Sequence, residues 1–417
     1  MTVQNIEQLG NEIEQAWRGS DYREEAFAEI AQAALAKRAL HRELSAVDVA
    51  RWLHRAPQVP PQAADAKFGE PPVTLFAGRH FYVEVLFWLD GTTAIHQHSF
   101  SGAFHVLFGS SIHTRYTFTP GETISDTLLL GELRAGKPEL LAAGDTRPIL
   151  AGNRLIHSLF HLERPSATLV VRTRHAAGTD PQYSYLPPGI AHDPFGEDAR
   201  LPRLQQLFEV LRHAQSPERS QLLREVIEGA DLHSCAILLV NLFRAQAIKK
   251  EESDALLAVL AGRHAALASA LALALNETRR QALVIDRRRT LHSPDHRFFL
   301  SLLLNIRRRD EIFRLIDERY ADAGALDRIV GWIEEITSLP PRPGSDSNEP
   351  NPIGYDLGEA EIQVFRALLA GRTPDEVVTA LAAQYDGVME QADDVHTLCE
   401  SIQTSALFRP LFENPTL

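Results

Sequence analysis

The sequence predicts a multidomain α+β protein in which a central all-β barrel is flanked by an N-terminal helical segment and a large all-α C-terminal region. The chain of 417 residues is long enough for two or three domains, each with its own core. The spacing of its apolar residues is helical up to about residue 55, changes to short β-branched and aromatic runs from 73 to 190, and becomes helical again from 200. We therefore predict N-terminal helices at 1–56, a β-barrel at 73–190, a helical domain at 200–338, a linker at 339–354 and a small helical domain at 355–417.

The N-terminal segment has an apolar residue at every third or fourth position, as one buried helix face requires: Ile6, Leu9, Ile13 and Trp17. Farther along, Ser45 with Asp48 three residues later has the pattern of a helix cap, which predicts a short helix through Trp52. A proline-rich connector from Pro57 to Pro72 separates these helices from the next region.

The strand-like runs between 73 and 190 are separated by turn signals rich in glycine, proline, asparagine and aspartate. Turns are expected at 90–91, 119–122, 135–138 and 151–153, and Pro187-Pro188-Gly189 ends the region. Short strands at this spacing predict a β-sandwich or barrel.

Beyond residue 200, helices are expected to begin where a serine or threonine cap precedes a proline. These pairs are Ser216-Pro217, Ser293-Pro294 and Thr373-Pro374. The stretch from Leu339 to Gly354 is rich in proline, serine and asparagine, so we expect a linker or loop there.

The composition excludes several classes of function. A formal net charge of -13 argues against nucleic acid as the main partner, because phosphate binding requires a concentrated basic surface. Cys235 and Cys399 are far apart in helix-like segments, so no disulfide framework is expected and a reducing, cytoplasmic setting fits. The N-terminus lacks the pattern of a secretory signal, and the longest apolar stretch, 265–275, is too short to span a bilayer, so no membrane contact is expected.

The most informative feature is the segment 95–98, Ile-His-Gln-His, followed later by 152–157, Gly-Asn-Arg-Leu-Ile-His. Alternate side chains of a strand share one face, so His96 and His98 are predicted to point together into the barrel. A third imidazole from a distant strand, His157, would complete a facial set of three neutral nitrogen ligands and leave other positions of a metal open. The alternative is that His-x-His lies on a solvated strand face and that His157 is a core histidine.

Around these histidines the chain resembles the cupins, and among them the cysteine-dioxygenase type of thiol dioxygenase. The resemblance covers about 120 residues and rests on 87–98, Phe-Trp-Leu-Asp-Gly-Thr-Thr-Ala-Ile-His-Gln-His, and on 152–157. In most cupins a glutamate four or five residues after His-x-His is a fourth ligand, whereas those positions here are Gly102 and Ala103. Thiol dioxygenases also lack this glutamate, and the resemblance implies a ferrous ion held by His96, His98 and His157. Zinc, nickel and manganese suit the same imidazoles, so ligand type alone does not select iron.

The resemblance further implies an arginine on an early strand that holds a substrate carboxylate. Arg79 is the candidate, and its alternative is a surface arginine at the start of a strand. The Ser-x-His-x-Tyr relay of the family is not matched, because 170–175 reads Val-Val-Arg-Thr-Arg-His. Arg172 or Arg174 could replace part of the relay by binding a substrate carboxylate through two hydrogen bonds. This departure puts cysteine itself in doubt as the substrate.

Other polar residues of the barrel segment are candidates for supporting roles. His161, four residues after His157, is a candidate proton relay or hydrogen-bond donor beside the site, with a structural histidine as the alternative. His113 and His105 also follow the first motif at short spacing. His105 has the opposite parity to His98, so it would face outward in an unbroken strand, but a turn near Ser101-Gly102 can reset that. Candidates for orienting a bound oxygen species are Tyr116, Tyr183 and Tyr185.

Outside the barrel, 292–296 (His-Ser-Pro-Asp-His) has a metal-like composition but coincides with a helix start, whose caps explain it. The basic triplets 287–289 and 307–309 are expected on solvated helix faces paired with acids, with an anionic ligand or peptide as the alternative. A second resemblance rests on 355–358, 364–369, 371–378 through Leu381 and Tyr385, and the chain from 394 onward. These segments resemble a small winged-helix domain of the peptide-recognition kind found in enzymes that modify ribosomal peptides. The helix at 375–385 has acids and no lysine or arginine, so contact with a peptide, a protein or a second subunit is expected rather than with DNA.

The residues and the resemblance together predict a non-heme iron, dioxygen-dependent oxidoreductase acting on a small thiol or a cysteine-containing peptide. A second interpretation is a non-catalytic cupin that binds a metal or ligand as a sensor, scaffold or peptide-binding partner, which the long helical portion makes credible. Isomerase or lyase chemistry at another divalent metal is a third. Metal identity and oxygen consumption would separate the three.

Overall fold

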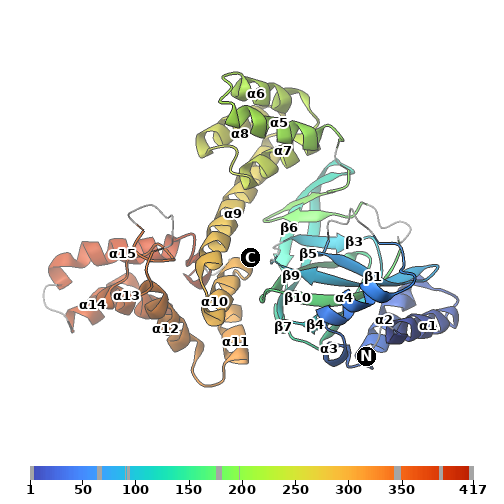
Figure 1. Cartoon of the computed structure of the whole chain (residues 1–417). Coiled ribbons are helices and arrows are strands. Elements are labelled where there is room, and N and C mark those ends of the chain that lie inside the picture. Colours follow the sequence, from blue (N-terminus) through green and yellow to red (C-terminus); the bar gives the residue numbers. More distant parts are fainter. Residues whose placement is uncertain are drawn as a thin grey trace. The chain divides into compact units, whose positions relative to one another are not determined.

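The structure is a computed structural model that describes residues 4–62, 68–89, 91, 94–174, 181–196, 198–341, 349–384 and 388–412 (Figure 1). The chain forms two compact units, Met1–Glu277 and Thr278–Leu417. The division falls within the long helix α9 (Ala265–Thr290). It therefore lies inside the segment 200–338 that the sequence predicts as one helical domain, and not at either of its ends.

The first unit begins with four helices: α1 (Gln4–Arg18), α2 (Glu24–Ala36), α3 (Leu40–Glu43) and α4 (Ala46–Arg55). All four predicted apolar positions of α1 are buried. The predicted cap of α4 is confirmed as a capping box, because the Ser45 side chain accepts from the Asp48 backbone and the Asp48 side chain accepts from the Ser45 backbone.

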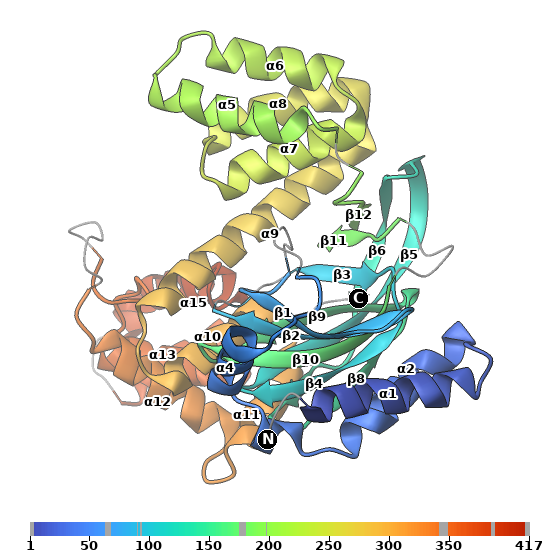
Figure 2. The same ribbon diagram turned by 45° about the vertical axis from the view of Figure 1, so that its right-hand side comes forward.

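A β-barrel of two antiparallel sheets follows, as predicted (Figure 2). One sheet has the order β1 (Pro72–Ala77), β2 (Phe81–Trp88), β10 (Ser166–Thr173), β4 (Gly102–Phe108) and β8 (Thr146–Ile149). The other has the order β6 (Leu128–Ala135), β12 (Ile190–His192), β11 (Ser184–Leu186), β3 (Ile95–His98), β9 (Gly152–His161), β5 (Ser111–Ser125) and β7 (Glu139–Leu141).

The first sheet is buried on both faces, and alternation along each strand decides which side chains reach the barrel interior. Val83 and Val85 of β2 pack with the N-terminal helices in one core. Leu86 of β2 packs with Phe104 and Val170 in a second core that fills the barrel. By the same alternation, the even-numbered residues of β2 point inward.

The predicted turn at 119–122 is wrong. These residues lie inside β5, which pairs with β6 on both sides of Pro120 and Gly121, and the register shifts between Pro120 and Glu122. Proline and glycine here form an irregularity in a long strand, where a proline without its N–H donor is tolerated.

The helices α5 (Leu201–His213), α6 (Arg219–Gly229), α7 (Leu232–Arg244) and α8 (Lys250–Arg263) complete the first unit together with the first part of α9. They share a core with four strand residues, which are Leu128, Leu130, Leu186 and Ile190. The helix expected from Ser216-Pro217 begins at Arg219, three residues after the serine.

The second unit contains the end of α9 and a further set of helices: α10 (Pro294–Asn305), α11 (Arg309–Arg319), α12 (Ala325–Thr337), α13 (Glu359–Leu369), α14 (Pro374–Ala382), η1 (Val388–Gln391), α15 (Ala392–Thr404) and α16 (Arg409–Phe412). The predicted caps Ser293 of α10 and Thr373 of α14 are confirmed. From 349 to 384 and from 388 to 412 the structure contains helices and no strand, so the β-wing of a winged-helix domain is not seen there. Of the described helices, none is long and apolar enough to cross a membrane.

The basic triplets need one correction. Arg288 is only 3% exposed, and its Nε donates to Ser301 Oγ at 2.7 Å, so 287–289 is not simply a solvated face. Arg308 pairs with Asp310 on the surface, as expected.

Gly102, at the start of β4, has no room for a side chain. A Cβ there would lie 2.0 Å from the carbonyl oxygen of Val171 and 2.9 Å from the Cα of Arg172. Both are backbone atoms, so relief requires β4 and β10 to separate beside Arg172. The missing glutamate of most cupins could not be accommodated at this position either.

We expect Gly102→Ala to destabilise the barrel by at least the ~1–3 kcal/mol typical of overpacking, measured as a shift of the denaturant unfolding curve. Gly121→Ala is the matched control, since its Cβ would meet its nearest atom at 3.6 Å. Equal unfolding curves for the two variants would contradict the expectation.

Candidate metal centre

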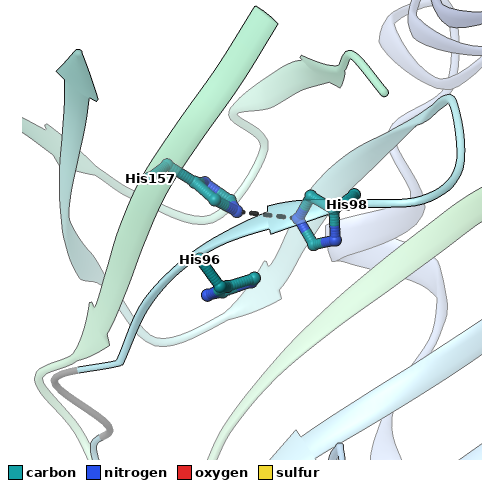
Figure 3. Close-up of side chains that lie close together, drawn as sticks. All are labelled: His96, His98 and His157. Carbon is teal, nitrogen blue, oxygen red and sulfur yellow. Dashed lines mark hydrogen bonds between the residues drawn. The ribbon is translucent and has the colours of Figure 1, made fainter. Parts of the chain in front are cut away.

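His96, His98 and His157 come together inside the barrel (Figure 3). The neighbouring strands β3 and β9 place His96 opposite His157. One potential ligand atom from each of the three side chains lies within 4.8 Å of the others, and all three residues are buried. His98 Nε2 is 2.9 Å from His157 Nε2. The predicted convergence of the three histidines is confirmed.

Gln97, between the two histidines of β3, holds the strand from its other face. The Tyr185 hydroxyl donates to Gln97 Oε1 at 2.7 Å, and Gln97 Nε2 donates to the Pro181 carbonyl at 3.0 Å. Tyr185 therefore orients the strand rather than an oxygen species in the site. Because Gln97 is anchored outward, the alternation of the strand turns His96 and His98 inward.

The environment keeps these imidazoles neutral, which is the form that binds metals. Burial lowers the pKa of His96 to about 4. Burial is also the largest cause that holds the pKa of His98 and of His157 well below the usual 6.5. Three neutral, buried nitrogen donors on one face fit a divalent transition metal. The 2.9 Å contact between His98 Nε2 and His157 Nε2 requires a proton on one of the two nitrogens, and a bound metal would displace it.

A chain of side chains leads from His157 to the surface, and the sequence did not reveal it. His157 Nδ1 is 3.0 Å from His113 Nε2, and His113 Nδ1 is 2.7 Å from Glu139 Oε1. Arg147 Nη2 donates to Glu139 Oε2 at 2.7 Å. The hydrogen bond with His113 is the main cause that lowers the pKa of Glu139 to about 2. Sequence reasoning noted His113 only for its spacing, whereas its register opposite Glu139 is a property of the β5–β7 pair.

Arg172, one of the three predicted anion-binding arginines, lies on the same inner surface as the triad. Its Nε forms an ion pair with Glu84 Oε1 at 2.7 Å. Its guanidinium lies 4.6 Å from the centres of the Tyr82 and Phe100 rings, and the Phe100 ring is 4.5 Å from that of His98. Burial raises the pKa of Glu84 while Arg172 opposes the rise. A cation is thus present one aromatic ring away from the triad, paired with a carboxylate that the sequence analysis did not single out.

Arg79 is not brought to the triad. It is exposed in the turn between β1 and β2. Arg174 lies beside it, donating from Nη2 to the Gly78 carbonyl and from Nε to the Arg79 carbonyl, both at 3.2 Å. His175, the end of the unmatched relay segment, lies outside the described residues.

His161 shares a face of β9 with His157 and is 2% exposed. Its ring stacks on Trp88 with centroids 4.6 Å apart, and its Nδ1 is 3.1 Å from Ser111 Oγ. Burial lowers the pKa of His161 to about 3. The structure places it in the barrel interior, and its role as a proton relay stays a prediction.

The buried His161 should make stability depend on pH. Below the usual pKa of 6.5 the unfolded chain binds a proton at His161 and the folded chain does not, so stability falls as pH decreases. At pH 5 the cost is about 2 kcal/mol, given 1.36 kcal/mol per pKa unit. We therefore expect the stability of His161→Phe relative to wild type to improve by about this amount between pH 7 and pH 5, in urea unfolding at both pH values. An unchanged difference would contradict this expectation.

The remaining candidates have structural partners. His105 is 2.8 Å from Thr146 Oγ1 and its ring is 5.6 Å from that of His41, on the helix-covered face of the sheet. Tyr183 donates to the Asp126 carbonyl, and the Tyr116 hydroxyl contacts Ser158 Oγ. His296 contacts Glu335 at 2.6 Å. Among the described residues, the triad is the one cluster of three or more potential metal ligands.

Comparison with known proteins finds no matching family model and no matching curated protein. Three solved structures illustrate the structural matches. A Bacillus halodurans protein is 16% identical over 29% of this chain and 75% of its own, with a TM-score of 0.19. A DMSP lyase structure is 15% identical, covering 42% of this chain and 96% of its own, with a TM-score of 0.22. An oxalate oxidase is 17% identical, covering 36% of this chain and 70% of its own, with a TM-score of 0.20. Likenesses at this level assign neither a family nor an activity to this chain.

Proposed function

We propose that this protein is a cupin-type, non-heme iron oxidoreductase that uses dioxygen to oxidise a small thiol or a cysteine-containing peptide. The observation that carries the proposal is the triad of His96, His98 and His157, which offers three neutral nitrogen donors and no carboxylate. Neutral ligands leave the charge of a ferrous ion uncompensated, which favours an anionic thiolate as a further ligand. Bound iron would supply the activation of dioxygen, and zinc, nickel and manganese are the competing ions.

The residues around the triad would bind and enclose the substrate. Arg172 forms an ion pair with Glu84, and its terminal nitrogens would donate to a substrate carboxylate or other anion. The Phe100 ring lies between this guanidinium and His98 and would keep water from the space between them. Phe68, which is 42% exposed, has its ring 5.4 Å from that of His96 and would border the substrate on its outer side. Holding thiolate and anion at two fixed points would orient the sulfur for reaction.

The alternative function is binding without turnover, as a sensor, scaffold or peptide-binding partner. The second unit supports it, because a hollow of about 360 Å³ lies beside α12 and α13. Its lining includes Glu334, Glu359, Leu357 and Ile362, which would suit a basic segment with apolar side chains. The free, buried Cys235 and Cys399 are compatible with the cytoplasmic location that we propose.

The test is oxygen consumption by protein loaded anaerobically with Fe(II), Zn(II), Ni(II) or Mn(II). Small thiols with and without a carboxylate, and cysteine-containing peptides, are added in turn, and sulfinate products are identified by mass. We expect uptake with the iron form alone and faster turnover of the thiols that carry a carboxylate. Tight iron binding without oxygen uptake on any thiol would reject the dioxygenase and favour the binding function.

A further inference from the structure

We propose that His113 and Glu139 are positioning residues that fix the tautomer and ring orientation of His157, so that its Nε2 lone pair faces the metal. This inference rests on the metal centre of the proposed function. It assigns a role to a buried histidine and a carboxylate from two further strands, neither of which belongs to the ligand set.

The donor and acceptor of each hydrogen bond in this chain follow from the carboxylate of Glu139 at its end. Glu139 is ionised, so it can only accept, and His113 must carry a proton on Nδ1 to donate to it. A His113 ring that carries its single proton on Nδ1 has a lone pair on Nε2, 3.0 Å from His157 Nδ1, and there it accepts from Nδ1–H of His157. Neutral His157 with its proton on Nδ1 has its lone pair on Nε2, the atom that faces His98. The chain of bonds thus selects the tautomer that a metal requires.

The geometry is rigid because backbone pairing sets both contacts. His113 of β5 lies directly across from Glu139 of β7 and from Leu159 of β9. His157, two residues before Leu159 on the same face, is the diagonal neighbour of His113. His113 is 1% exposed, and its ring meets the Phe104 ring edge-on at 5.9 Å.

Arg147 holds the far end of the chain. It donates to Glu139 Oε2 from Nη2 at 2.7 Å and from Nε at 3.1 Å, and Nε also reaches Oε1 at 3.2 Å. Oε1 lies closer to His113, whose Nδ1 is 2.7 Å away. Arg147 comes from β8 in the opposite sheet, and the carboxylate is therefore fixed from both sheets of the barrel. Outer partners of this kind raise the basicity of a ligand and fix its orientation. In metal-binding proteins generally, their loss weakens metal binding about 10–100-fold.

The experiment measures metal affinity, with Zn(II) and Fe(II) as probes in competition with a chromophoric chelator. His113→Phe removes the acceptor for His157, and Glu139→Leu removes the acceptor for His113. Glu139→Gln keeps an oxygen that accepts from His113 and is the conservative counterpart. His105→Phe is the matched control. His105 is equally buried and contacts the Thr146 hydroxyl, but it lies on the helix-covered face of its sheet, away from the barrel interior.

We expect His113→Phe and Glu139→Leu to bind both metals about 10–100-fold more weakly than wild type, Glu139→Gln to lie between them and wild type, and His105→Phe to be unchanged. Circular dichroism of the metal-free proteins checks folding. If His113→Phe does not fold, the metal affinity of Glu139→Leu, a substitution at a partly exposed residue, is the deciding measurement. Wild-type affinity in Glu139→Leu and in folded His113→Phe would overturn the positioning role and leave the metal centre standing. Absence of metal binding by the wild type would overturn both.

Discussion

We expect His157→Ala and His98→Ala to abolish metal binding. Each substitution leaves two imidazoles, and the vacated side would fill with water, which is a weaker and unoriented ligand. The loss in affinity should exceed the 10–100-fold that loss of an outer hydrogen-bonding partner costs. The measurement is the metal content of protein equilibrated with one equivalent of Fe(II) or Zn(II) and then desalted, determined by elemental analysis.

His192→Ala is a suitable control for this prediction, because His192 of β12 is also buried but its ring lies beside that of His233, not in the triad. The control should retain the wild-type metal content. Retention of metal by both triad variants would mean that the ion is held elsewhere, and the proposed centre would be rejected. Equal loss in the control would point instead to general damage to the barrel.

We expect Arg172→Leu to destabilise the protein at neutral pH. The substitution removes the partner of Glu84, whose side chain is 9% exposed, and leaves a buried carboxylate without a compensating charge. Breaking a buried ion pair from one side typically costs about 3–5 kcal/mol. Burial already raises the pKa of Glu84, and without Arg172 it rises further, so protonation should relieve the penalty as pH falls. Denaturant unfolding at neutral and mildly acidic pH measures both effects.

The double variant Arg172→Leu with Glu84→Leu separates the ion pair from the packing. It removes both charges, so we expect it to be much more stable than Arg172→Leu alone, since replacing a buried pair by apolar residues is often neutral. If the single and double variants have the same unfolding curve at every pH, the expectation is contradicted. Glu84 would then not be a buried charge without a partner in Arg172→Leu. In the folded variants, the proposed anion-binding role predicts a raised KM for thiols with a carboxylate and little change for thiols without one.

The local features of the fold could be predicted because each depends on neighbouring residues. The capping pattern at Ser45 and the apolar spacing of α1 act within one or two turns of a helix, and both are confirmed. The same reasoning failed at 119–122, where Pro120 and Gly121 have turn-like composition. There, pairing with β6 on both sides outweighs local preference, and only the sheet determines that outcome.

The site shows the same division. His96 and His98 could be placed together from strand alternation alone, and His157 was the predicted third ligand, which the resemblance also implies. The sequence could not show which arginine lies closer to the triad. Arg79 lies in an exposed turn and Arg172 at an inward position of β10, and this difference depends on the fold. The partners Glu84 and Glu139 had no local signal at all, since neither stands in a motif with the histidine or arginine that it contacts.

By itself, the sequence determined the change from helix to strand and back and the inward pair of histidines, because periodicity and alternation are properties of the chain. The tertiary structure decided which distant side chains share the barrel interior. It set His113 and Glu139 behind His157 and Glu84 against Arg172 through strand register and sheet packing. Such contacts join residues on separate strands, and their energy depends on burial, which exists only once the two sheets have closed on each other.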